Sequence, residues 1–291
     1  MRLGFHLPIR GGFSSVPSLA RSAGCECLQI FSQNPRGWAG HPIDPAEAAL
    51  FRREARAAGL TPLVIHAAYL INLCASDKDL LRRSRRMLNG ELKRAGLLSI
   101  DFVVVHMGSR GTQPLNTAIT IMAESVDRAL SRIPPGVTLL LENTAGAGGQ
   151  VGHTFEEMAV ITALLEDQTG WGLCLDTAHL CAAGYDLSSP EGVKLALDEC
   201  DRLIGLDHVK LIHLNDSRLP VGSRRDRHTH IGRGYIGKRG MRSLLREPRL
   251  RELAAIMETP KEDDTDDVMN MRLARRLRDG WIRAVLSQRL K

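Results

Sequence analysis

The 291-residue sequence lacks the features that mark several special classes of protein. It has no apolar run long enough to span a membrane, and we expect no secretory signal in the start, Met1 to His6. Its six cysteines form no Cys-x-x-Cys pair and no disulfide-style framework, which predicts free thiols and a cytoplasmic protein. It shows no internal repeat, low-complexity tract or linker, so we expect a single domain over residues 1–291.

The composition is that of an ordinary globular protein, with 43% hydrophobic and 25% charged residues. The 39 lysines and arginines exceed the 33 acidic residues and give a formal net charge of +6. This surplus is compatible with a nucleic-acid partner but does not establish one.

Short apolar runs alternate along the chain with longer helical stretches. The predicted strands are Leu3–His6, Cys27–Phe31, Leu63–His66, Phe102–His106, Val137–Glu142, Trp171–Asp176, His208–His213 and Leu253–Glu258, and the last predicted helix is a basic one over Asn270–Lys291. Apolar strands that alternate with helices indicate a parallel sheet buried on both faces. Eight strands are the number that closes a (β/α)₈ TIM barrel, which is the α/β fold that we expect.

Six of the eight predicted strands end on a histidine or acidic residue that we take as a candidate site residue. These residues are His66, His106, Glu142, Asp176, His213 and Glu258. A single histidine at the end of a strand is usually a hydrogen-bonded structural residue. In a (β/α)₈ barrel, however, the carboxyl ends of all strands meet at one mouth, where active sites lie. His179, Asp226 and His228 follow the sixth and seventh strands closely enough to join them and bring the set to nine.

Nine imidazoles and carboxylates at one opening would repel one another or lie unsatisfied unless cations bind between them. Zinc accepts both kinds of ligand, and nine ligands exceed what one zinc ion can use, so we expect a cluster of two or three metals. The loop from His213 to Gly234 also carries arginines that attract anions: Arg218, Arg224, Arg225, Arg227 and Arg233. Metals beside arginines suggest a phosphate substrate and in-line displacement at phosphorus.

The motifs around these residues resemble the endonuclease IV family of apurinic/apyrimidinic (AP) endonucleases, whose fold is also a (β/α)₈ barrel. The resemblance extends from about Gly4 to Pro260 and rests on the order, types and spacing of all nine candidate ligands. The motifs are His66 to Leu73, His106 to Ser109, Glu142 to Gly146, Asp176 to His179, Ala183 to Asp186, His213 to Asp216, Gly222 to His228 and Glu258 to Pro260.

The resemblance implies three zinc ions per chain and implies which residues would bind each. His66 and His106 would bind the first, and Glu142 would bridge it to the second. Asp176, His213 and Glu258 would complete the second site, and His179, Asp226 and His228 would bind the third. Glu142 and Glu258 would also be the catalytic residues.

The implied activity is hydrolysis of the phosphodiester 5′ to an abasic site in duplex DNA during base excision repair, leaving a 3′-hydroxyl and a 5′-deoxyribose phosphate. Arg36, Tyr69 and Leu70 occupy the positions that enter the DNA in this family. Extrusion costs least for a nucleotide that has already lost its base. We expect a monomer with no membrane association and no nucleotide cofactor.

Pro8 departs from the family pattern, because it removes a backbone donor and a hydroxyl near the DNA-facing rim.

Two other functions stay open on the residues alone. One is a sugar isomerase or epimerase, since such barrels also bind divalent metals. It would need two metals at most, so the separate group of His179, Asp226 and His228 disfavours it. The other is a lesion-binding protein without catalysis, which would not require nine ligands.

Overall fold

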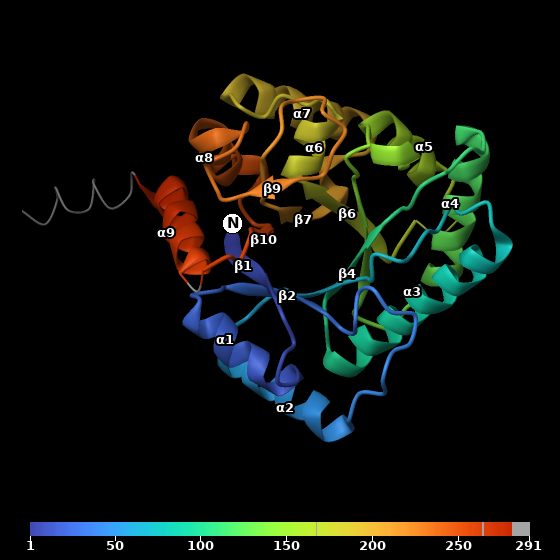
Figure 1. Ribbon diagram of the computed structural model, residues 1–291, viewed down its shortest axis with the longest axis horizontal. Coiled ribbons are helices and arrows are strands. Elements are labelled where there is room, and N and C mark those ends of the chain that lie inside the picture. The colour runs from blue at the N-terminus through green and yellow to red at the C-terminus, as the bar shows by residue number, and fades with distance from the viewer. Residues whose placement is uncertain (167, 264, 281–291) are drawn as a thin grey trace, which may run out of the picture.

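The computed structural model describes residues 1–166, 168–263 and 265–280. These residues form a closed barrel of eight parallel strands with helices around its outside (Figure 1). The barrel strands, in chain order, are β1 Arg2–Leu7, β2 Cys27–Phe31, β3 Leu63–His66, β4 Phe102–His106, β5 Thr138–Glu142, β6 Trp171–Asp176, β7 Val209–His213 and β10 Ala254–Met257. The ring closes where β10 pairs with both β7 and β1, so the predicted TIM barrel is confirmed.

The barrel interior is filled by inward-facing side chains, one each from β2 to β7 and two from β10. These residues are Cys27, Val64, Val104, Leu140, Cys174, Leu211, Ala254 and Ile256, and all are buried. Strand β1 contributes Gly4 instead, because a Cβ atom there would lie 2.0 Å from the carbonyl oxygen of Cys27. The opposite faces of the strands pack against the helices, as expected for a parallel sheet that is buried on both sides.

The described helices are α1 Val16–Ser22, α2 Pro45–Ala57, α3 Lys78–Leu98, α4 Leu115–Leu130, α5 Phe155–Ala163, α6 Thr177–Ala183, α7 Pro190–Leu203, α8 Gly237–Arg246 and α9 Asp266–Asp279. Several begin at a side chain that caps a free backbone amide. Asp77, for example, accepts a hydrogen bond from the amide of Leu80 at the start of α3. None of the described helices is long and apolar enough to cross a membrane.

Several predicted boundaries were wrong by a few residues. Strand β1 continues through Leu7, β7 begins at Val209 rather than at His208, and β10 stops at Met257, one residue before Glu258. The basic helix expected over residues 270–291 begins earlier, at Asp266, and residues 281–291 lie outside the described part of the chain. The loop after β7 contains a two-stranded hairpin, β8 Asp216–Ser217 with β9 His228–Thr229, that the sequence did not reveal.

Candidate metal centre

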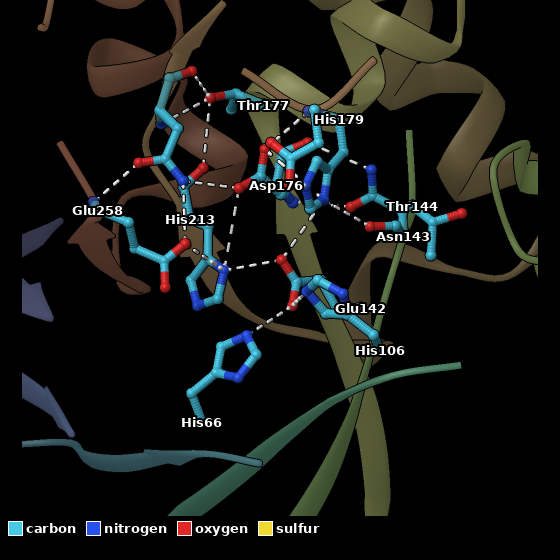
Figure 2. Close-up of polar contacts among 12 residues, drawn as sticks. His66, His106, Glu142, Asn143, Thr144, Asp176, Thr177, His179, His213 and Glu258 are labelled. Carbon is cyan, nitrogen blue, oxygen red and sulfur yellow. Dashed lines mark hydrogen bonds and ion pairs between the residues drawn. The ribbon is translucent and has the colours of Figure 1, made fainter. Parts of the chain in front are cut away.

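The nine candidate ligands converge at the carboxyl end of the barrel. Figure 2 shows seven of them pointing toward a common centre: His66, His106, Glu142, Asp176, His179, His213 and Glu258. Five of these are the last residues of β3, β4, β5, β6 and β7, and Glu258 directly follows β10. Because neighbouring strands are parallel, their carboxyl ends share one edge, and the side chains meet there.

The first group consists of His66, His106 and Glu142. The Oε2 atom of Glu142 lies 2.9 Å from Nε2 of His106 and 3.3 Å from Nε2 of His66. Burial alone would raise the pKa of Glu142, but the imidazoles of His106 and His213 hold that pKa well below its usual range. Glu142 is therefore a carboxylate, even though its side chain is fully buried.

The second group shares Glu142 with the first and adds Asp176, His213 and Glu258. The Nδ1 atom of His213 lies 2.9 Å from Oε1 of Glu142, 3.5 Å from Oε2 of Glu258 and 3.9 Å from Oδ2 of Asp176. Glu142 thus presents one oxygen to each of two groups, which is the geometry of a bridging ligand.

The third group contains Asp176, His179 and His228. Asp226 belongs beside it, with its carboxylate 3.3 Å from Nε2 of His179 and 3.1 Å from Nε2 of His228. Burial alone would lower the pKa values of His179 and His228. The carboxylates of Asp176 and Asp226 nevertheless raise the pKa of His179 to about 10 and that of His228 to about 9. Burial alone would raise the pKa of Asp226, but the same two histidines lower it strongly.

The hairpin of β8 and β9 carries His228 into the site by pairing it with Ser217. Asp216, at the start of the hairpin, is not directed at the cluster. Its carboxylate accepts hydrogen bonds from the amides of Gly234, Ile236 and Gly237 and so fixes the end of the loop. The loop arginines 218, 224, 225, 227 and 233 are all exposed.

Backbone carbonyls select which nitrogen of each histidine faces the cluster. Nδ1 of His66 lies 2.7 Å from the carbonyl oxygen of Ala67. Nδ1 of His179 lies 2.9 Å from that of Asn143, and Nδ1 of His228 lies 3.3 Å from that of Glu258. A carbonyl only accepts, so each Nδ1 donates, and Nε2 is the atom directed at the carboxylates. His213 is oriented the other way, with Nδ1 toward the carboxylates and Nε2 toward Gln29.

Amide side chains behind the ligands fix the carboxylates. Asn215 donates to Oδ2 of Asp176 at 2.6 Å and to Oε2 of Glu258 at 3.2 Å. Asn143 accepts from the Asp176 amide at 2.7 Å. Asn72 instead donates to the Ser109 carbonyl and joins two loops.

The donor set fits transition-metal cations such as zinc. The ligand atoms of each group lie within 4.8 Å of one another and are imidazole nitrogens and carboxylate oxygens. Glu142 Oε2 and His228 Nε2 are buried, and other candidate ligands lie 2.9 to 3.7 Å from them. A cation between such atoms offsets the cost of burying them away from water.

The three expected DNA-contacting residues lie on two neighbouring loops of the same mouth. Arg36 is exposed in the loop after β2, and Tyr69 and Leu70 follow β3. The side chain of Tyr69 is 54% exposed, although its ring centroid lies 5.6 Å from that of His66. It therefore stands between the candidate metal site and the solvent.

Helix α3 anchors the loop that carries Arg36. Glu91 accepts hydrogen bonds from the side chains of Ser32 and Gln33, and Arg94 donates to the carbonyls of Ser32 and His41.

Sequence reasoning missed Glu91, Gln29 and His6. His230, which we did not assign as a ligand, contacts Asn270 and lies outside the three groups.

Comparisons with known proteins identify relatives that cover nearly the whole chain. The family model "Xylose isomerase-like TIM barrel" matches residues 17–284. A probable endonuclease 4 from Chloroflexus aurantiacus is 42% identical over 281 residues, covering 96% of this chain and 99% of its own. A probable endonuclease 4 from Halothermothrix orenii is 39% identical over 277 residues, covering 95% of this chain and 100% of its own.

Solved structures support the same family and the same fold. Endonuclease IV from Thermus thermophilus superposes with a TM-score of 0.85 at 38% identity, covering 95% of this chain and 98% of that one. A D-tagatose 3-epimerase-like protein has a TM-score of 0.70 at 16% identity over the whole of both chains, which reflects the shared fold alone. The chain therefore belongs to the endonuclease IV family, within the xylose isomerase-like TIM barrels.

Proposed function

We propose that this protein is a zinc-dependent AP endonuclease of base excision repair. It would hydrolyse the phosphodiester 5′ to an abasic site in duplex DNA and leave a 3′-hydroxyl and a 5′-deoxyribose phosphate. The observation that carries the proposal is the convergence of nine ligands in three groups that share Glu142 and Asp176. Relatives named endonuclease 4 over nearly their full length support it.

Three zinc ions would bind to the three groups. His66, His106 and Glu142 would hold one ion, and Glu142, Asp176, His213 and Glu258 a second. His179, Asp226 and His228 would hold the third, with Asp176 close enough to His228, at 3.7 Å, to assist. Bound zinc supplies a nucleophile at neutral pH and neutralises the charge that develops on the phosphate oxygens.

Among the carboxylates of the first two groups, Glu258 is the best placed to accept a proton from the attacking water. Its side chain is 16% exposed, whereas those of Glu142 and Asp176 are fully buried. Burial alone would raise the pKa of Glu258, but His213 and His6 hold it well below its usual range. Glu258 is therefore ionised at neutral pH, and its Oε2 atom faces the ligand cluster.

The loop residues would recognise the lesion. Tyr69 and Leu70 would fill the gap left by the missing base, and Arg36 would contact the strand from the neighbouring loop. The exposed arginines around the mouth and the formal charge of +6 would attract the DNA backbone.

The decisive experiment is incision of a labelled duplex that contains one abasic site, with an undamaged duplex as the control. The proposal predicts one cut 5′ to the lesion, a 3′-hydroxyl on the product, and about three zinc ions per chain by mass spectrometry. Absence of cutting by zinc-loaded protein would refute the endonuclease. Cutting that persists after complete zinc removal would refute the metal dependence.

A further inference from the structure

We propose that Gln29 is a positioning residue that prepares both His213 and Glu258 to bind metal. This inference rests on the metal centre proposed above. Gln29 lies in the middle of β2, its side chain is fully buried, and it is not itself a member of any ligand group. Its side-chain amide contacts both His213 and Glu258.

The two ends of the Gln29 amide face different partners. The carbonyl oxygen lies 2.8 Å from Nε2 of His213, and the amide nitrogen lies 2.8 Å from Oε1 of Glu258. The same nitrogen lies 3.0 Å from Nδ1 of His6, which in turn lies 3.1 Å from Oε1 of Glu258.

Both contacts require the same amide orientation. A carboxylate only accepts hydrogen bonds, so the NH₂ group must face Glu258. The carbonyl oxygen then faces His213, and because it only accepts, Nε2 of His213 must carry the proton. The reversed amide would place its oxygen against the Glu258 carboxylate and leave that oxygen without a donor.

This orientation determines which atom of His213 and which atom of Glu258 is available to bind metal. With the Nε2 proton held by Gln29, Nδ1 of His213, the atom directed at Glu142, is the nitrogen that would give up its proton to bind metal. With Oε1 of Glu258 bound to Gln29, its Oε2 is the atom that faces the cluster. Gln29 thus does for His213 what backbone carbonyls do for His66, His179 and His228. Such outer contacts typically change metal affinity by about 10- to 100-fold.

The test is zinc release from the loaded enzyme into a chromogenic chelator. Gln29→Met fills similar space without the hydrogen bonds, and Gln29→Asn keeps the amide but is too short to reach both partners. We expect one ion per chain to leave about tenfold faster or more, while the other two leave at the wild-type rate. The matched control for zinc release is Gln33→Met, because Gln33 donates to Glu91, which is not a candidate ligand.

Two further readouts separate positioning from folding. In the zinc-loaded enzyme, the NMR signal of the Nε2 proton of His213 should shift in Gln29→Met, because the amide oxygen that accepts this proton is lost. Incision should lose kcat with little change in KM, because Gln29 is buried and cannot touch DNA. Wild-type release of all ions by whichever variant folds would overturn the proposal. A wild-type protein that binds no zinc would instead refute the metal centre itself.

Discussion

His179 and Asp226 face each other across the mouth of the barrel, with 3.3 Å between Nε2 and Oδ2. One residue comes from the short helix after β6 and the other from the hairpin loop after β7. Their proximity ties the long loop to the barrel, and it also sets the charge of the third ligand group.

Metal binding at this group should release protons. With pKa values of about 10 and about 9, His179 and His228 are protonated at pH 7.5 when no cation is bound, whereas zinc binds neutral imidazole. Affinity should therefore weaken as the pH falls. Calorimetry of zinc binding to chelator-treated protein, in two buffers of different ionisation enthalpy, measures the number of protons released. Identical heats in both buffers would contradict the prediction.

Replacing Glu258 with glutamine should separate DNA binding from incision. The change keeps the size of the side chain but removes the acceptor charge, so abasic duplex should still bind while incision falls by about 100-fold or more. Filter binding and single-turnover incision measure the two effects, with zinc content determined in parallel. Glu262→Gln, an exposed change nearby, is the control. Near-normal turnover by Glu258→Gln would disprove its role.

The ring of Tyr69 should matter more for damaged than for undamaged DNA. Tyr69→Ala should weaken binding to abasic duplex by about fivefold or more, in line with the stacking energy of one aromatic ring, and should change binding to intact duplex less. Tyr69→Phe retains the ring and should bind like the wild type. Fluorescence anisotropy with both duplexes gives the comparison. Equal losses on both would make Tyr69 a general surface contact.

The buried thiols predict alkaline destabilisation. Burial raises the pKa of Cys25 and Cys181 to about 11, and that of Cys200 to about 12, from an ordinary value of 9.0. Above pH 9 the unfolded chain loses these protons and the folded chain keeps them. The stabilisation is therefore complete below pH 9 and is lost toward pH 11 to 12, at about 1.4 kcal/mol per pH unit for each thiol.

Denaturant unfolding at pH 8, 9 and 10 measures this decline in the free energy of unfolding. A Cys25→Ala, Cys181→Ala variant should show a shallower decline between pH 9 and 10. The native wild type should also react slowly with a thiol reagent at pH 8, because all six cysteines are buried. A pH-independent free energy would show that the thiols do not contribute.

The sequence predicted the barrel and the location of the site because both depend on local patterns. His66, His106, Glu142, Asp176 and His213 each end a strand, and the carboxyl ends of parallel strands must meet. The residues of the third group were among the candidates from the sequence, but their assignment to one metal depended on the resemblance, because the hairpin of β8 and β9 places His228 beside His179. Each hairpin strand has two residues, too few to show a periodic pattern.

Gln29 was missed for a different reason. A polar residue inside the apolar run Cys27 to Phe31 is a signal, but the sequence does not state which partners a buried amide will meet. Asp216 illustrates the same limit in reverse, since it lies among the candidate ligands in the sequence and binds backbone amides in the structure. A carboxylate that holds a metal and one that caps a loop have the same sequence signature.

The closing strand also has a consequence for synthesis of the protein. The second ligand group draws on β5, β6 and β7 and on Glu258, which directly follows β10, the strand that seals the ring against β1. A nascent chain that still lacks this segment does not have the group, and neither does a fragment truncated before it. The second ligand group can therefore form only after Glu258 has been synthesised and β10 has closed the ring against β1.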